Sequence, residues 1–217
     1  FSNVSFNYSK NTNYLLNDVN INVCKGESIA IIGESGAGKS TLLDLILGLL
    51  SPTKGNIVID SKYDLNDSNI NSLISYVPQS IYLNDDSILN NIISINKDKK
   101  VNLKLVSELV SKLSLNDLIK NSDNGLNEHV GDRGGLLSGG QKQRLGIARA
   151  LYCQRDILVL DEATSSIDKE LELKIVNNVF KLMKGKTIIC ITHNSEILSF
   201  FDKVFEVKKG KVTLIEK

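Results

Sequence analysis

The stretch GESGAGKST, residues 33–41, is the feature that most constrains this chain. It follows the apolar run 29–32 and leads into the apolar run LLDLILGLL, which predicts a strand, a glycine loop and a helix. Glycines let the backbone curl tightly enough to aim several N–H groups at one phosphate. The helix should begin near Lys39 and add its positive dipole end. The Lys39 side chain could then reach the outer phosphates, and the Ser40 hydroxyl could ligate magnesium, which favours a nucleotide-binding P-loop over a plain glycine turn.

Composition narrows the class of protein. With 41% hydrophobic and 24% charged residues in 217, the chain suits one folded domain with a substantial core. The 26 Lys and Arg residues balance 25 Asp and Glu residues, so composition gives no support for a nucleic-acid-binding surface. Cys24, Cys153 and Cys190 are scattered and lack metal-ligand spacing. We therefore expect reduced thiols rather than a disulfide or a zinc site.

No transmembrane span is predicted. The longest apolar run, residues 42–50, contains Asp44 and is far shorter than the roughly 20 residues that cross a bilayer. The first residue is Phe1 rather than Met, and no signal peptide precedes it, so we expect the chain to be a part of a longer protein.

Alternating apolar and polar residues predict strands at 1–8 and 17–24, and a third strand is expected at 56–60. Continuous apolar runs, such as 157–160, suit central parallel strands instead. Together with the helical patterns, they predict an α/β fold: a P-loop core with a mainly parallel sheet, an N-terminal antiparallel β subdomain and an inserted α-helical subdomain.

Helical periodicity is clearest in three segments. Between residues 88 and 118, Val101, Leu105, Leu109 and Leu113 recur at four-residue spacing and are predicted to face the core. Two further helices are predicted at 141–152 and 169–183, with Ser138 in the N-cap position of the first.

Polar side chains follow several predicted strands. Because the carboxyl ends of parallel strands meet at one crevice, Gln79, Asp161, Glu162 and His193 should gather beside the P-loop. Asp161, with Ser40 and a contribution from Gln79, suits a magnesium site. Glu162 could orient and deprotonate a water molecule, and His193 could donate a hydrogen bond to the terminal phosphate. On these residues alone, the acid pair could instead cap a helix and His193 could be structural.

The motifs GESGAGKST, YVPQ, LSGGQ, ILVLDE, SSID and ITH occur in this order, and the whole chain resembles the ATP-binding cassette family. LSGGQ is the most specific of them. The resemblance implies an ATPase that uses ATP and Mg²⁺. It assigns adenine stacking to Tyr8; Walker A to Gly33, Glu34, Ser35, Gly36, Ala37, Gly38, Lys39, Ser40 and Thr41; the Q-loop to Gln79; the signature to Ser138, Gly139, Gly140 and Gln141; the Walker B carboxylate to Asp161; the catalytic base to Glu162; the D-loop acid to Asp168; and the switch histidine to His193.

The signature indicates a partner. Ser138 and two glycines at a helix start offer a second anion site, although Walker A already holds the phosphate of its own subunit. A second copy, bound head-to-tail around two ATP molecules, best explains this site, with a ligand-free helix cap as the alternative. SSID replaces the family's commoner SALD, and ITHN replaces a pattern that usually ends in Arg.

The resemblance also implies one nucleotide-binding domain over residues 1–217, divided at about residues 80 and 150. The segment NEHVGDRGGLLSGGQ, with Glu128 and Asp132, resembles the loop of exporter-type cassettes that contacts a transmembrane domain, which we expect on the N-terminal side. The resemblance thus implies a location on the cytoplasmic face of the inner or plasma membrane. The run PQSIYLNDDSILNNI resembles transporters that flip lipid-linked saccharides. The rival is a soluble cassette ATPase acting on ribosomes or DNA, but the chain has neither a second cassette nor a long coiled coil.

Overall fold

The computed structural model describes residues 1–8, 14–60, 63–64, 72–94, 100–120 and 122–215. The chain forms two compact units, which are described separately: a terminal unit, Phe1–Ile74 with Gly185–Lys217, and a central unit, Ser75–Lys184. The predicted boundaries near residues 80 and 150 remain a prediction.

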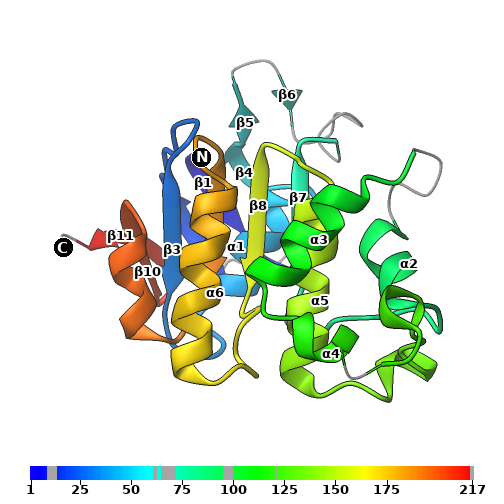
Figure 1. The fold of residues 1–217 in the computed structure, drawn as a ribbon. Coiled ribbons are helices and arrows are strands. Elements are labelled where there is room, and N and C mark those ends of the chain that lie inside the picture. Colours follow the sequence, from blue (N-terminus) through cyan, green and yellow to red (C-terminus); the bar gives the residue numbers. More distant parts are fainter. Residues whose placement is uncertain (9–13, 61–62, 65–71, 95–99, 121, 216–217) are drawn as a thin grey trace. The chain divides into compact units, whose positions relative to one another are not determined.

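A mainly parallel sheet forms the core of the terminal unit (Figure 1). Its order is β11 (Lys211–Ile215), β10 (Lys203–Lys208), β3 (Ser28–Ile32) and β9 (Thr187–Ile191). Strand β3 pairs in parallel with β10 and β9, and β11 is an antiparallel edge strand. The β-branched residues of β3 and β9 are buried, apart from the half-buried Ile32, as expected of central parallel strands.

The terminal unit also holds the predicted antiparallel sheet, in the order β2 (Leu16–Val19), β1 (Ser2–Phe6) and β4 (Lys54–Asn56). The strand predicted at 17–24 ends early, at Val19. Beyond it, Ile21 still exchanges backbone hydrogen bonds with Phe1, at 2.8 and 3.3 Å. The strand predicted at 56–60 is divided between two sheets, since β4 pairs with β1 whereas β5 (Val58–Ile59) pairs with β6 (Tyr63–Asp64). Helix α1 (Lys39–Ile46) and the 3-10 segment η5 (Ser195–Phe200) complete the unit.

The central unit contains the neighbouring strands β8 (Ile157–Asp161) and β7 (Ile74–Val77), the latter at its boundary. Its helices are α2 (Ile88–Ile93), α3 (Leu103–Lys112), α4 (Asn116–Lys120), α5 (Gly139–Tyr152) and α6 (Lys169–Leu182), with short 3-10 turns η3 (Gly125–Asn127) and η4 (Asp132–Gly134). Helix α5 packs against α2 and α3, so it organises the helical part of this unit (Figure 1).

The predicted stripe of α3 is only partly correct. Val101 precedes the helix and, like Leu105, is half-buried. The Asn102 side chain caps α3 by accepting a hydrogen bond from the Leu105 N–H at 3.1 Å. The buried face consists of Val106, Leu109, Val110 and Leu113. This set follows the 3.6-residue period of a helix more closely than a strict spacing of four.

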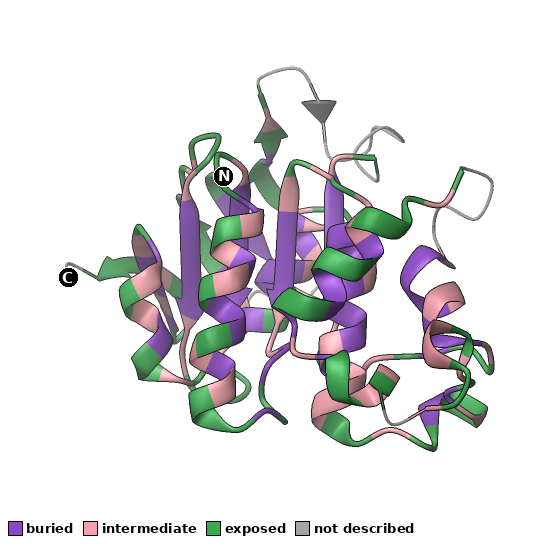
Figure 2. Ribbon diagram, in the orientation of Figure 1, coloured by how far each residue is buried: buried purple, intermediate pink, exposed green. Residues whose placement is uncertain are grey.

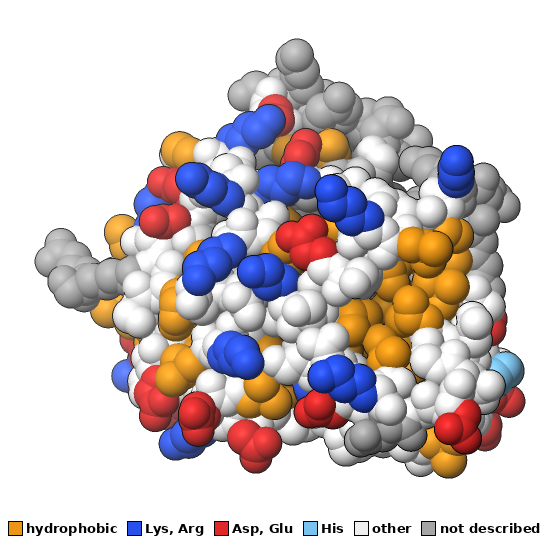
Figure 3. Space-filling view, viewed as in Figure 1, with side chains coloured by type: hydrophobic (Ala, Val, Ile, Leu, Met, Phe, Trp, Pro, Cys, Tyr) orange, Lys and Arg blue, Asp and Glu red, His pale blue; other side chains and the backbone are white. Residues whose placement is uncertain are grey.

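Burial follows the expected pattern in each unit: strands and the inner faces of helices are buried, and most turns are exposed (Figure 2). On the face drawn in Figure 3, Lys and Arg side chains are interspersed with Asp and Glu rather than gathered in one patch. Within the described part of the chain, every helix is too short or too polar to cross a bilayer.

Candidate functional site

The P-loop joins β3 to α1, and steric constraints explain why glycine occupies two of its positions. Gly33 has a φ of +147°, and a Cβ there would lie 2.4 Å from the carbonyl oxygen of Val207 on β10. Gly38, with a φ of +105°, occupies the N-cap of α1. A side chain is therefore excluded at Gly33 by the close carbonyl and disfavoured at Gly38 by the backbone conformation. The predicted start of the helix at Lys39 is confirmed.

Lys39 is held over its own loop. The side chain is only 7% exposed, and its Nζ donates hydrogen bonds to the carbonyl oxygens of Gly33 at 2.8 Å and Glu34 at 2.9 Å. An ammonium group has three donors. The loop therefore carries a fixed positive charge beside the free N–H groups at the start of α1, as an anion site requires.

Tyr8 approaches the same helix from the β subdomain. Its hydroxyl lies 3.0 Å from Oγ1 of the buried Thr41, and its ring packs edge-on against Phe6, with 4.9 Å between ring centroids. The side chain nevertheless remains 68% exposed. An exposed aromatic ring anchored to the P-loop helix is suited to stacking on a planar base.

A surface hollow of about 320 Å³ borders the P-loop. Glu34, Ser35, Gly36 and Ala37 form one side of it, and residues 206–209, at the end of β10, form the other. Because residues 34–37 line this hollow, the tip of the P-loop is open to solvent.

His193 lies at the same edge of the sheet as the P-loop. Ile191, the last residue of β9, pairs with Ile31 of the parallel strand β3. His193 and Gly33 each follow this pair by two residues, so the strands direct them toward one edge. The exposed His193 thus lies at the P-loop end of the terminal unit, as predicted.

The central unit brings the acid pair and Gln79 together. Asp161 ends β8 and accepts a hydrogen bond of 3.4 Å from the Tyr76 hydroxyl on β7. Glu162 follows with a φ of +47°, a left-handed conformation that is uncommon for a residue other than glycine. Gln79 Nε2 donates a hydrogen bond of 2.8 Å to Glu162 Oε2.

The signature forms a complete helix cap. Ser138 Oγ accepts from the Gln141 N–H at 3.2 Å, and Gln141 Oε1 accepts from the Ser138 N–H at 2.8 Å. This reciprocal capping box starts α5 at Gly139. A Cβ at Gly140 would lie 2.9 Å from the carbonyl oxygen of Ser166, so glycine is needed for this close approach. Asp168 occupies the N-cap position of α6.

Two residues of α5 were missed by the sequence reasoning. Gln143 is 5% exposed and binds the segment between β8 and α6. Arg144 donates to the carbonyl oxygens of Gly140 and Ser114, and burial lowers the pKa of its guanidinium. The signal for Gln143 was its place on the apolar face of α5, one turn before Ile147.

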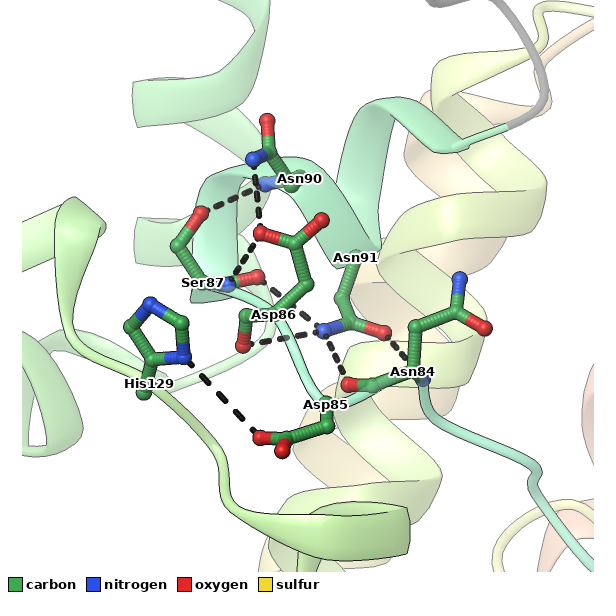
Figure 4. Close-up of polar contacts among 7 residues, drawn as sticks. All are labelled: Asn84, Asp85, Asp86, Ser87, Asn90, Asn91 and His129. Atoms are coloured by element: carbon green, nitrogen blue, oxygen red, sulfur yellow. Dashed lines mark hydrogen bonds and ion pairs between the residues drawn. The ribbon is translucent and has the colours of Figure 1, made fainter.

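The loop after Gln79 is organised around Asn91, which is fully buried (Figure 4). Its amide donates to the carbonyl oxygens of Asn84 and Ser87, at 3.1 and 3.0 Å. Its Oδ1 accepts from Arg149 at 2.9 Å, and Arg149 also donates to the carbonyl oxygen of Tyr82. Burial lowers the pKa of this guanidinium. These hydrogen bonds fix the shape of the run PQSIYLNDDSILNNI within the central unit.

The loop that precedes the signature pairs with this segment. The Ile88 N–H donates to the Glu128 carbonyl at 2.9 Å, and the Val130 N–H donates to the Asp86 carbonyl at 3.1 Å. Beside this pairing, His129 Nδ1 lies 3.9 Å from Asp85 Oδ1, with both side chains well exposed (Figure 4). The run PQSIYLNDDSILNNI and the loop that precedes LSGGQ thus lie side by side.

The predicted site residues divide between the two units. Tyr8, the P-loop and His193 belong to the terminal unit, whereas Gln79, Asp161, Glu162, the signature and Asp168 belong to the central unit. Within the terminal unit His193 lies at the edge of the P-loop, and within the central unit Gln79 contacts Glu162, whereas the gathering of all these residues beside the P-loop stays a prediction. A glycine loop between a parallel strand and a helix, with its buried lysine, defines a P-loop nucleotide-binding protein.

Comparison with known proteins narrows this class. A family model for ABC transporters matches residues 16–165. The ATP-dependent lipid A-core flippase of Wigglesworthia glossinidia brevipalpis is 40% identical over 217 residues, 98% of this chain and 37% of that protein. ABC transporter B family member 29, chloroplastic, of Arabidopsis thaliana is 39% identical over 212 residues, which cover 96% of this chain and 33% of that protein.

A solved structure of a bacterial Atm1-family ABC exporter with ATP bound matches with a TM-score of 0.90 and 31% identity, over 98% of this chain and 37% of that one. The family model covers most of the chain, so the chain belongs to the ABC transporter family, as a nucleotide-binding domain of the exporter type. The predicted fold class is thereby confirmed. The chain spans about a third of the length of these relatives.

Proposed function

We propose that the chain is the ATP-hydrolysing motor domain of a membrane exporter and that it works as a head-to-tail dimer around two Mg-ATP. The observation that carries this proposal is that one chain has two helix starts built for anions. One is the glycine loop before α1, with the buried Lys39. The other is the start of α5, capped by Ser138 and free of side chains at Gly139 and Gly140.

The residues of the terminal unit are suited to binding ATP. The P-loop N–H groups and Lys39 would hold the phosphates, which would draw the ammonium away from the carbonyls of Gly33 and Glu34. Tyr8, anchored through Thr41, would stack on the adenine. His193 would donate a hydrogen bond to the terminal phosphate as charge develops there.

The residues of the central unit are suited to the chemical step. Glu162 would take a proton from the attacking water, and Gln79 would orient that carboxylate through the hydrogen bond between them. The held position of Glu162 matters because proton abstraction requires the base within hydrogen-bond reach of the water.

The residues fit a magnesium ion. The Ser40 hydroxyl is exposed at the start of α1, and Asp161 offers a carboxylate at the end of β8. These are hard oxygen donors, and magnesium in phosphate sites is bound through one or two such ligands together with phosphate oxygens. Ser40, Asp161 and Gln79 would hold the ion, which would neutralise phosphate charge when bound.

The dimer would complete each site. Ser138, Gly139 and Gly140 of one copy would contact the terminal phosphate held by the P-loop of the other, and Asp168 would lie near the same boundary. ATP would then stabilise the interface, and hydrolysis would release it.

A membrane partner is proposed from the relatives and from the paired segments of Figure 4. The surface formed by residues 82–91 and 128–130 would dock on the transmembrane domain of the same protein, on the N-terminal side and at the cytoplasmic face. Several relatives are named lipid A-core flippases, which supports a lipid-linked saccharide as the transported substrate.

Hydrolysis measured at increasing protein concentration tests the proposal. We expect the rate to rise more steeply than linearly, because neither half-site works alone. Ser138→Arg should abolish this rise while nucleotide binding to the P-loop persists. Asn102→Ala is the matched control, since it removes the cap of α3 without touching the signature. A rate strictly proportional to concentration, or a Ser138→Arg variant of unchanged activity, would overturn the proposed dimer.

A further inference from the structure

Gln143 joins the signature helix to the segment that carries the catalytic carboxylate. It lies on α5, one turn after the start of the helix, and only 5% of its surface is exposed. Its Nε2 donates to Ser165 Oγ at 3.1 Å, and its Oε1 accepts from the backbone N–H of Ser166 at 2.8 Å. Both ends of one buried amide are therefore used by the same two-residue stretch.

This stretch is closely tied to Glu162. The connection from β8 to α6 spans only residues 162–168, and it starts in the left-handed conformation of Glu162. In its middle, the hydroxyl of the buried Thr164 donates to Glu172 Oε1 at 2.5 Å. The Ser165 N–H donates to the Glu162 carbonyl at 3.1 Å, so the two residues share one turn.

The start of α5 also contacts this segment, at Ser166. The missing side chain at Gly140 leaves room for the carbonyl of Ser166, and Gly139 approaches the Ser166 side chain in the same way. A shift of the signature would therefore displace residues 165 and 166. The hydrogen bond of 2.8 Å from the Ser166 N–H to Gln143 Oε1 joins this exposed segment to the helix, so the two should move together.

We propose that Gln143 is a positioning residue that couples the signature to Glu162 of the same subunit. The inference rests on the proposed dimer, in which the signature contacts the partner's nucleotide while Glu162 acts on the nucleotide of its own P-loop. Gln143 would then link the two ATP sites: closure of one signature on phosphate sets the position of the base in the other site.

Glutamine suits this task because its amide offers a donor and an acceptor in one plane. Leucine has a similar size but neither group, and it would leave the Ser166 N–H without its partner. Gln143→Leu should therefore allow the segment to shift while α5 stays packed. Displacement of a catalytic group by about 1 Å costs about a hundredfold in rate.

The test is steady-state hydrolysis by Gln143→Leu across a range of ATP concentrations. We expect kcat to fall about tenfold to a hundredfold and KM to change less than about threefold. In the Glu162→Gln background, Gln143→Leu should leave the ATP-dependent dimer intact by size-exclusion chromatography. Ser75→Ala is the matched control, because it removes a buried hydrogen bond of 2.9 Å from the other end of α5, at Ala150.

A double-mutant cycle identifies the route. If Gln143 acts through its contact with Ser165, then Ser165→Ala should add less than about threefold to the loss in Gln143→Leu. Full multiplication of the two losses would overturn the coupling, as would normal kcat in Gln143→Leu. An equal fall in kcat for Ser75→Ala, at matched thermal stability, would show a merely structural role. The proposed function is tested separately by Glu162→Gln alone, which should stop hydrolysis. If hydrolysis continues in that variant, the proposed function fails, whatever the result for Gln143→Leu.

Discussion

The side-chain amide of Gln79 donates a hydrogen bond of 2.8 Å to the carboxylate of Glu162. The first residue follows β7 and the second follows β8, two neighbouring strands of the central unit. One oxygen of the carboxylate is thus held by a neutral amide donor from the segment that follows the neighbouring strand.

Glu162→Gln tests the role of this carboxylate. Glutamine keeps the size and the hydrogen-bonding capacity of the side chain but cannot accept the proton of a water molecule. We expect hydrolysis to fall by a factor of about 10² to 10⁴, and ATP-bound dimers should accumulate. Phosphate release and size-exclusion chromatography measure the two effects. Glu170→Gln, at an exposed position on α6, removes the same charge and should leave both unchanged. Undiminished hydrolysis in Glu162→Gln would refute the assignment.

Lys39→Ala should weaken nucleotide binding itself. The substitution removes the buried ammonium that the phosphates would engage and leaves the carbonyls of Gly33 and Glu34 without this donor. Loss of a charged hydrogen bond costs about 1.5–3 kcal/mol, so the dissociation constant for ATP should rise about tenfold to a hundredfold. Titration with a fluorescent ATP analogue measures it. Lys25→Ala, at an exposed turn, serves as the control. Equal affinities for the two variants would argue against the predicted phosphate contact.

His193→Ala should slow turnover more than binding. A donor directed at charge that develops in the transition state contributes to kcat, and its removal costs about tenfold to a hundredfold. The KM for ATP should change much less. His129→Ala, which removes the other histidine of the chain, is the control for turnover by the isolated chain. Normal turnover in His193→Ala would reduce this residue to a structural role.

Glu27 should make stability depend on pH. Lys203 Nζ donates to its Oε2 at 2.8 Å, the Cys24 N–H donates at 2.7 Å, and these hydrogen bonds hold the pKa of the carboxyl below its ordinary value of 4.5. Because the pKa is lower in the folded state, the contribution is complete above pH 4.5 and is lost as the pH falls through the folded pKa.

Glu27→Gln should therefore lower the melting temperature at pH 7 and have less effect at about pH 3. The pair is partly exposed, so we expect about 0.5 kcal/mol, or about 1–2 °C. Thermal unfolding followed by circular dichroism at both pH values measures the difference. A gap of the same size at both pH values would contradict the ionic origin.

The sequence by itself determined the local parts of the site. The glycines of GESGAGKST specify a tight loop because only glycine tolerates φ values such as +105° at Gly38 and the close approach at Gly33. Ser138 followed by Gln141 predicts a helix start because both capping bonds span three residues. Each of these features depends on neighbours along the chain, so a linear reading finds them.

Only the tertiary structure decided which side chains meet. Gln79 and Glu162 are 83 residues apart, and Gln143 is 23 residues from Ser166. No spacing rule predicts that a glutamine on the buried side of α5 will form hydrogen bonds with the turn that follows β8. Strand ends were also set by partners, since the strand predicted at 56–60 is divided between β4, which pairs with β1, and β5, which pairs with β6. Contacts of this kind arise from packing between distant segments, and packing is a property of the folded chain rather than of any short stretch.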